Sequence, residues 1–217
     1  MLRSFLIDRW DQVWFASWQH FSLVAQSLAL ATGLSLILAF VVYRSPKLAS
    51  LASGVSAVGL TIPSFALIGL LVAPLGFGVL PSVVVVTFYA VLPILRNAVV
   101  GLNGVDRAVV ESARGIGMSR MRTMLTIEFP LAWPVILAGV RTSAQMAMGI
   151  AAVAAYALGP GLGVFIFSGL SRLGGANAFE AVVVGVVGVI VVALVLDLLL
   201  AGLGRLTIPR GIRAGAR

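Results

Sequence analysis

Apolar residues in this chain are gathered into five long runs, separated by short breaks rich in polar residues, glycine and proline. Each run has about 20 residues or more, the length that a helix needs to cross roughly 30 Å of hydrocarbon. The pattern lacks the weak alternation over about ten residues that is typical of an outer-membrane β-barrel. The sequence therefore predicts an all-α, polytopic membrane protein with about five transmembrane helices, at residues 23–43, 51–72, 79–100, 131–157 and 181–203.

The second apolar run is interrupted near its middle by Thr61, Ile62, Pro63 and Ser64. A break at this depth frees backbone groups that lipid cannot satisfy, so neighbouring helices or a water-filled path must satisfy them. Two interpretations stay open. One is a discontinuous helix beside a solute path, with Thr61, Pro63 and Ser64 as candidate pathway residues. The other is an ordinary proline kink in which Thr and Ser bond back to their own helix.

The third run carries three residues spaced four apart, Tyr89, Pro93 and Asn97. This spacing places them on one face of a helix, so we expect that face to line the same candidate pathway. Arg96 lies beside it towards the inner end of the run. A charge at that position faces the helix bundle or extends to the headgroups, and we assign it a structural role.

Composition supports a membrane protein, because 60% of residues are hydrophobic and 10% are charged, whereas roughly a quarter are charged in a soluble domain. Residues 1–20 contain Trp10, Trp14 and Trp18 but lack the apolar core of a cleaved signal peptide. We interpret them as an interfacial segment. Residues 21–206 are then the transmembrane domain, and residues 207–217 form a basic C-terminal tail.

Basic residues are distributed unevenly between the two sets of loops. The positive-inside rule places the richer set in the cytoplasm, which predicts an outside N-terminus and a cytoplasmic C-terminus. The net charge of +8 is then explained by membrane-flanking loops and anionic lipids, with no nucleic acid as partner. The inner set is Arg44, Lys47, Arg107, Arg114, Arg120, Arg122, Arg205, Arg210, Arg213 and Arg217, and the outer set is Arg3, Arg9 and Arg172.

The longest polar interruption, residues 103–130, is predicted to form two short helices on the cytoplasmic membrane surface. Asp106 and Ser119 are candidate N-caps for the two helices. Gly115 and Gly117 lie between them and allow a sharp turn. A merely solvated connector is the alternative interpretation.

The same loop carries a spaced motif, E-S-A-x3-G-x9-I-x-F-P, that runs from Glu111 to Pro130. It resembles the EAA motif of the membrane subunits of ATP-binding-cassette (ABC) importers, E-A-A-x3-G-x9-I-x-L-P, and departs from it at Ser112 and Phe129. The resemblance implies a coupling helix that docks on a separate ATPase. The residues that would carry the coupling are Glu111, Ser112, Ala113, Gly117, Ile127 and Pro130.

Three further segments, residues 61–67, 89–97 and 161–169, resemble the permeases of osmoprotectant importers, and the likeness covers most of residues 23–206. This family takes up quaternary amines such as glycine betaine, choline and carnitine, and has the type I ABC importer permease fold. Methionine or other amino-acid importer permeases are the nearest alternative. A passive channel or membrane scaffold is a remote one, because neither needs a cytoplasmic docking helix.

The chain itself lacks an ATP site, since the P-loop pattern G-x-x-x-x-G-K-[ST] is absent and the one lysine, Lys47, follows Pro46. The resemblance implies no cofactor in this chain and ATP with magnesium on two cytoplasmic ABC subunits. It further implies a second permease chain, identical or paralogous, an external substrate-binding protein, and a multi-pass location in the bacterial cytoplasmic membrane.

Two expectations concern contacts of the fourth run. Arg141 lies within this run and is expected to pair with Glu128, Glu111 or Asp197. Small residues permit close helix approach in membranes, and we expect those of this run to pack across a permease dimer. They are Ala144, Ala147, Gly149, Ala151 and Ala154.

Overall fold

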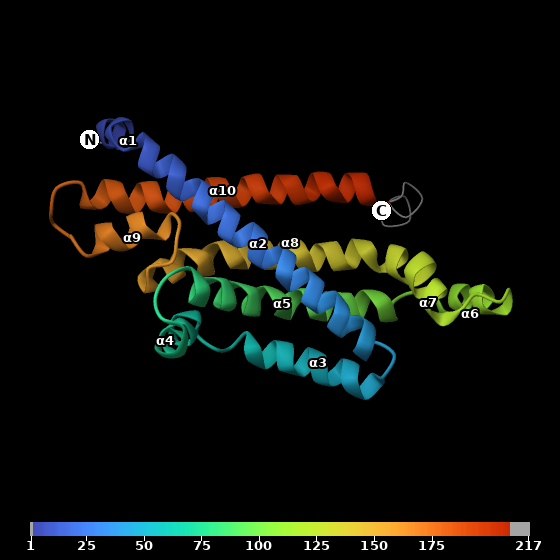
Figure 1. Ribbon diagram of the computed structural model, residues 1–217. Helices are drawn as coiled ribbons and strands as arrows, with labels where there is room; N and C mark the ends of the chain where they lie inside the picture. Colours follow the sequence, from blue (N-terminus) through green and yellow to red (C-terminus); the bar gives the residue numbers. More distant parts are fainter. Residues whose placement is uncertain (1, 209–217) are drawn as a thin grey trace.

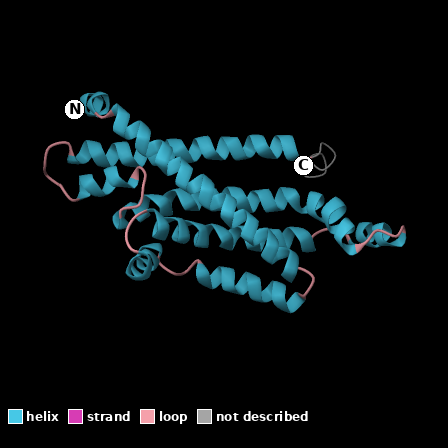
Figure 2. Cartoon of the chain, in the orientation of Figure 1, coloured by secondary structure: helices cyan, strands magenta, loops and turns pink. Residues whose placement is uncertain are grey.

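The computed structural model describes residues 2–208, and this part of the chain folds into helices joined by turns, with no strand (Figure 2). Residues 209–217, most of the predicted basic tail, lie outside the described range. The elements are α1 (Leu2–Asp8), α2 (Trp10–Val42), α3 (Pro46–Gly59), α4 (Ser64–Leu75), α5 (Val79–Asn103), α6 (Arg107–Gly115), α7 (Arg120–Thr123), the π-helix η1 (Met124–Glu128), α8 (Phe129–Ala154), the 3-10 helix η2 (Ala155–Ala157), α9 (Gly163–Leu170) and α10 (Ala178–Thr207).

Four continuous helices of the described chain are long and apolar enough to cross a membrane. They are α2, α5, the continuous stretch Arg120–Ala157 that contains α8, and α10. The pair α3 and α4 gives up to a fifth span, but its two halves meet at 91°. The predicted all-α membrane fold is therefore confirmed, with four spans and one broken one.

The helices α5 and α8 form the centre of the molecule and lie side by side (Figure 1). Their close approach requires glycine, because a Cβ added to Gly139 would lie 2.6 Å from the Cβ of Asn97. The hydroxyl of Ser143 donates to the carbonyl of Ala90 at 2.8 Å, and that of Ser35 in α2 donates to the carbonyl of Val91 at 3.1 Å. Such hydroxyl bonds between helices replace the water that lipid cannot supply.

Most of the small residues of α8 pack inside this chain. Ala147, Ala151 and Ala154 have 0% exposed surface and Ala144 has 2%. Ala144, Ala147 and Ala151 contact the main apolar core, which includes residues of α2, α5 and α10. The prediction that these alanines pack across a dimer is therefore wrong. Gly149 alone among the five is exposed.

The first span begins earlier than predicted, because α2 runs without a break from Trp10 to Val42 over 33 residues. Its length is about 50 Å at 1.5 Å per residue, more than the hydrocarbon requires. His20, at the predicted end of the interfacial segment, is buried, and its Nε2 lies 3.2 Å from the carbonyl oxygen of Met148. The boundary predicted at residue 20 thus falls inside a packed helix.

The interruption of the second run is a true break between two helices. A sharp kink at proline bends a helix but leaves it continuous, whereas Pro63 here has an extended conformation (φ −65°, ψ 125°) and precedes α4. Thr61 donates its hydroxyl to the carbonyl of Val58 at 2.7 Å, which is the expected back-bonding. The two halves nevertheless diverge by 91°, so the helix is discontinuous at this point, while the solute path beside it stays a prediction.

Candidate functional site

The loop 103–130 has the predicted pair of capped helices, α6 and α7. Asp106 accepts a hydrogen bond from the amide of Ala108 at 2.9 Å, and Ser119 accepts one from the amide of Arg122 at 3.3 Å. Both predicted N-caps are confirmed. The turn between the helices requires glycine at Gly117, whose φ is +88°. Gly115 remains part of α6.

The EAA-like residues of α6 face in different directions. Glu111 and Ser112 are exposed, and the hydroxyl of Ser112 donates to the carbonyl of Ala108 at 2.7 Å. Ala113 is 5% exposed and lies against the rest of this chain, so its small size serves internal packing. Beyond α6, the apolar side chain of Ile116 is 82% exposed. Glu111, Ser112 and Ile116 therefore belong to the exposed surface of α6 and its end.

The end of the loop is joined to the first span by a buried polar cluster. Glu128, the last residue of the π-helix η1, is 3% exposed. Its Oε2 accepts a hydrogen bond from the Tyr43 hydroxyl at 2.5 Å, and its Oε1 accepts one from Arg44 Nη2 at 3.3 Å. Arg44 Nε also donates to the Tyr43 oxygen at 2.6 Å. Ile127 and Pro130, on either side, are half-buried.

Burial, aided by Glu128 and opposed by Arg44, keeps Tyr43 protonated and able to donate. Burial raises the pKa of Tyr43 to about 12, and its hydrogen bond to Glu128 acts in the same direction. The phenol therefore stays protonated at neutral pH and satisfies one carboxylate oxygen. Sequence reasoning missed this cluster, because Glu128 occupies an unrestricted position of the motif. The one sequence feature that could have indicated it is the position of Glu128, a single acidic residue at the start of an apolar run.

A hollow of about 520 Å³ connects the cluster with α6. Glu111 and Glu128 lie on the same hollow, together with the basic side chains of Arg107 and Arg114. Motion of α6 against the bundle would thus change the shape of a space that borders the inner ends of α2 and α5. The remaining lining residues are Tyr43, Arg44, Pro46, Leu102, Asn103, Val105 and Val110.

The candidate pathway residues are only partly brought together. The Tyr89 hydroxyl donates to the carbonyl oxygen of Ile62, which ties α5 to the broken helix. Both residues line an open hollow of about 370 Å³ with Ser64 of α4 and with Met146, Gly149, Ile150 and Val153 of α8. Thr61 and Pro63 are exposed at the break.

Pro93 and Asn97 lie further along α5 and do not reach this hollow. Pro93 is buried, and the Asn97 amide donates to its carbonyl at 2.9 Å while the side chain packs over Gly139. Asn97 is eight residues from Tyr89, about 12 Å along a helix. Of the predicted pathway residues, Tyr89 and those at the break therefore lie near the hollow. Pro93 and Asn97, further along the predicted face, serve helix packing in this chain.

An ion pair connects the two last spans. Arg141 Nε and Nη2 donate to Oδ1 and Oδ2 of Asp197 at 2.9 and 2.7 Å, a bidentate arrangement with fixed geometry. Of the three partners considered from sequence, Asp197 is the one that Arg141 binds, and Glu128 is bound by Arg44. Over residues 2–208 no three acidic, histidine or cysteine side chains cluster as metal ligands.

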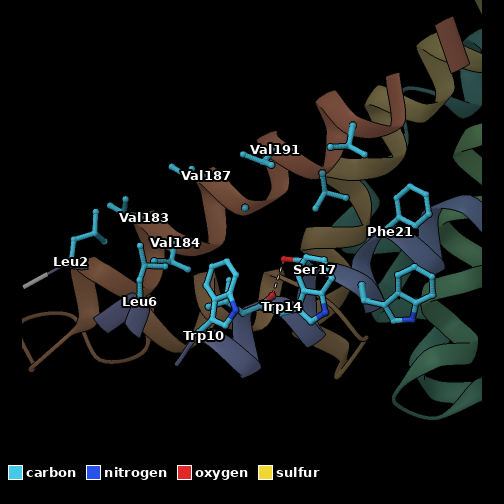
Figure 3. Close-up of a pocket in the computed structure, with 15 residues that line it drawn as sticks. Leu2, Leu6, Trp10, Trp14, Ser17, Phe21, Val183, Val184, Val187 and Val191 are labelled. Carbon is cyan, nitrogen blue, oxygen red and sulfur yellow. Dashed lines mark hydrogen bonds between the residues drawn. The ribbon is translucent and has the colours of Figure 1, made fainter. Parts of the chain in front are cut away.

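A third hollow, of about 570 Å³, lies between the N-terminal helices and α10 (Figure 3). Its lining is apolar apart from Ser17, whose hydroxyl is bonded to the carbonyl of Val13 at 2.7 Å. Trp10, Trp14 and Trp18 face it from α2, opposite a row of α10 valines that includes Val187. It offers no charged group that could position a polar solute, so it is not the candidate site.

The described chain is thus a bundle of candidate membrane spans with a pair of short capped helices in the 103–130 loop. The chain belongs to the family described as binding-protein-dependent transport system inner membrane component, whose model matches residues 31–208. The match includes the break, the 103–130 loop and the ion pair.

Relatives of known role are similar over nearly the whole chain. The carnitine transport permease protein OpuCB of Listeria monocytogenes is 35% identical over 91% of this chain and 88% of its own length. The choline transport system permease protein OpuBB of Bacillus subtilis is 34% identical over 97% and 95%. The osmoprotectant import permease protein OsmW of Salmonella typhimurium is 35% identical over 96% and 98%.

The fold is that of a solved ABC importer. An inward-facing structure of the MetNI methionine ABC transporter matches with a TM-score of 0.71, over 95% of this chain and 99% of that one, at 20% identity. This likeness confirms the type I importer permease fold predicted from the sequence.

Proposed function

We propose that this chain is the permease subunit of an ATP-driven importer of osmoprotectant quaternary amines of the glycine betaine, choline and carnitine type. The observation that carries the proposal is the 34–35% identity to choline and osmoprotectant permeases over at least 96% of the chain. The methionine transporter is similar at 20% identity. Identity at this level indicates a shared fold but does not indicate a shared solute. An amino-acid solute is thus the weaker candidate.

The importer works through an ATPase on separate subunits. Two cytoplasmic ABC subunits hold ATP and magnesium, and one of them docks on the exposed face of α6 and its end, at Glu111, Ser112 and Ile116, while the other docks on the second permease chain. A lone carboxylate beside an apolar side chain suits a groove that has one cation and an apolar floor. Gly117, Ile127 and Pro130 set the shape of the loop and its connection to α8. A second permease chain, identical or paralogous, completes the membrane path.

The orientation has an outside N-terminus and a cytoplasmic C-terminus, in a bacterial cytoplasmic membrane. Two observations support it. Ten of the basic residues fall on one side by the sequence count. The α2–α3 turn, the α6–α7 loop and the end of α10 all lie at one end of the molecule, on the right of Figure 1. The basic loops therefore share a membrane face with the docking helix.

Movement of the docking helix has two routes into the membrane. One is the continuous helical stretch Arg120–Ala157, which reaches from α7 through η1 to the far end of α8. The other is the bond between Glu128 and Tyr43, which pulls the inner end of α2. A π-helix within a longer helix marks a site of local adaptability, and η1 lies where these two routes diverge.

Solute reaches the permease from an external binding protein and passes the broken helix. At the break, the Ile62 carbonyl accepts a hydrogen bond from Tyr89, and the hollow there is lined by both polar and apolar atoms. Weak binding is what a conducting path needs, because the solute must leave again. Selectivity then resides chiefly in the binding protein.

The proposal is tested by the ATPase activity of the assembled importer. The permease is reconstituted with its ATPase and binding protein, and ATP hydrolysis is measured with glycine betaine, choline, carnitine or methionine. Stimulation by one or more quaternary amines and not by methionine is expected. Stimulation by methionine alone would support the amino-acid alternative, and hydrolysis that no solute changes would favour a channel or scaffold.

A further inference from the structure

The Arg141–Asp197 ion pair lies within two of the candidate membrane spans, well away from their ends. Trp133 Nε1 donates to Thr207 Oγ1 at 2.7 Å, which fixes the register of α8 against α10 at their shared inner end. Arg141 is eight residues beyond Trp133 and Asp197 is ten residues before Thr207, so the pair lies about 12 to 15 Å deeper. Half of a hydrocarbon core of roughly 30 Å is the same distance.

The charged groups at this depth are not sealed within the chain. The side chain of Arg141 is 41% exposed and that of Asp197 is 25% exposed. Gln145, one turn beyond Arg141 on α8, is exposed. Thr142 and Gly149 are also exposed, and the spacing of three or four residues places these side chains on one helix face. We call this face, from Arg141 to Gly149 with Asp197, the polar face.

Lipid cannot cover the polar face at low cost. Charged side chains at the bilayer centre face the bundle interior or a water-filled cavity, because their exposure to hydrocarbon is expensive. The same chain presents an ordinary lipid face elsewhere on α10, where the exposed side chains are wholly apolar. That face is made by Val187, Val191, Leu194 and Leu198, all at least 51% exposed. The polar face thus differs from the apolar surface that this chain presents to lipid on α10.

The polar face continues into the hollow at the broken helix. Gly149 lines that hollow together with Ile62, Ser64 and Tyr89. The freed backbone of the α3–α4 break and the ion pair therefore belong to one continuous surface of the chain. Polar backbone at membrane depth and a polar helix face both call for water.

We propose that Arg141, Gln145 and Asp197 form part of the wall of the water-filled solute route, at the membrane midplane. The inference rests on the proposed function, because such a route exists in the assembled importer. The paired guanidinium and carboxylate carry no net charge together, so the wall neither repels a quaternary ammonium nor traps it. Gln145 adds neutral hydrogen-bonding groups beside them. These properties suit a path that passes a polar solute with little binding.

The route is tested by thiol accessibility in the assembled importer, since the chain has no cysteine. Gln145→Cys is treated with a membrane-impermeant methanethiosulfonate reagent that carries a trimethylammonium group. Leu198→Cys, beside Asp197 on the lipid face, is the matched control. Thr142→Cys replaces Gln145→Cys if the latter fails to assemble. Rates are measured without nucleotide and after trapping with ATP and vanadate.

Labelling of Gln145→Cys should be at least about tenfold faster than that of Leu198→Cys, because the reacting thiolate forms in water and not in hydrocarbon. Its rate should also change between the two nucleotide states, since alternating access opens and closes the route. A rate as slow as the control in both states would overturn the proposal. A rate that is the same in both nucleotide states would also overturn it, because the face would then not lie on a route that opens and closes.

The labelling result does not depend on the identity of the solute. Stimulation of ATP hydrolysis by quaternary amines is measured separately on the cysteine-free parent. Loss of that stimulation would contradict the proposed solute while state-dependent labelling still supported the route. Conversely, stimulated hydrolysis with unlabelled Gln145→Cys would keep the function and place the route elsewhere.

Discussion

Tyr43 donates its hydroxyl hydrogen to Glu128 across 85 positions of sequence, at 2.5 Å, and so joins the end of the first span to the end of the cytoplasmic loop. Both side chains are buried. A contact of this kind transmits displacement, because it joins the two segments directly through side chains that Arg44 also binds. It connects the docking helix to the bundle at a second point besides the chain itself.

Replacement of Glu128 tests this contact. Glu128→Leu leaves the buried Tyr43 hydroxyl without its acceptor and Arg44 without its carboxylate partner, and should lower the stability of the permease by about 1–3 kcal/mol. Glu128→Gln is the matched control, because its amide oxygen still accepts from Tyr43. Thermal unfolding of the purified variants in detergent measures the difference. Equal midpoint temperatures of unfolding for Glu128→Leu and the parent would show that the contact does not stabilise the permease.

The docking surface is tested by two substitutions on the exposed side of α6. Glu111→Lys reverses the lone charge, and Ser112→Trp adds bulk where the ATPase would lie. Both should abolish solute-stimulated ATP hydrolysis and weaken co-purification with the ATPase, while the permease stays in the membrane. Ala113→Trp is not suitable, since Ala113 is 5% exposed and its replacement would disturb the loop itself. Normal stimulation in both surface variants would refute docking at α6.

Loss of one member of the Arg141–Asp197 ion pair should be more harmful than loss of both. Asp197→Leu removes the bidentate partner of Arg141 and leaves a charge without a neighbouring anion between α8 and α10, which weakens the packing of these two helices. The amount of folded permease in membranes should fall accordingly. The double variant Arg141→Leu with Asp197→Leu removes both charges and should recover the folded amount. A single variant as abundant as the parent would argue against pairing as the reason for these charges.

Topology is tested with single cysteines at two exposed positions at opposite ends of the molecule. Ser119→Cys lies before α7 and Ser171→Cys follows α9. An impermeant maleimide should label Ser171→Cys in intact cells and Ser119→Cys after the membrane is opened. The reverse result would place the 103–130 loop outside and remove it as an ATPase contact.

Hydropathy and cap chemistry predicted much of this fold, because both act over a few neighbouring residues. The spans follow from runs of about 20 apolar residues, and the caps at Asp106 and Ser119 follow from side chains that reach their own backbone. The EAA-like spacing also indicated α6, because its defining residues, Glu111 to Gly117, are close together in the sequence. The family assignment rests on those motifs and is confirmed by the match to residues 31–208.

What sequence could not provide are relationships between helices. The alanines of α8 were expected at a dimer contact, yet they face α5 and α2, since composition does not say which neighbour a small residue meets. Glu128 had no visible partner until α2 and η1 were seen together. The 91° break likewise depends on Tyr89, whose hydroxyl binds a carbonyl 27 positions away.

Uptake into sealed vesicles tests the central claim most directly. Vesicles that contain the permease and its ATPase, with saturating binding protein outside and ATP inside, are given radiolabelled glycine betaine, choline, carnitine or methionine. ATP-dependent accumulation of at least one quaternary amine, absent in Glu111→Lys vesicles, is the predicted result. Accumulation of methionine alone, or solute equilibration that is independent of ATP and unaffected by Glu111→Lys, would contradict an osmoprotectant importer driven through α6.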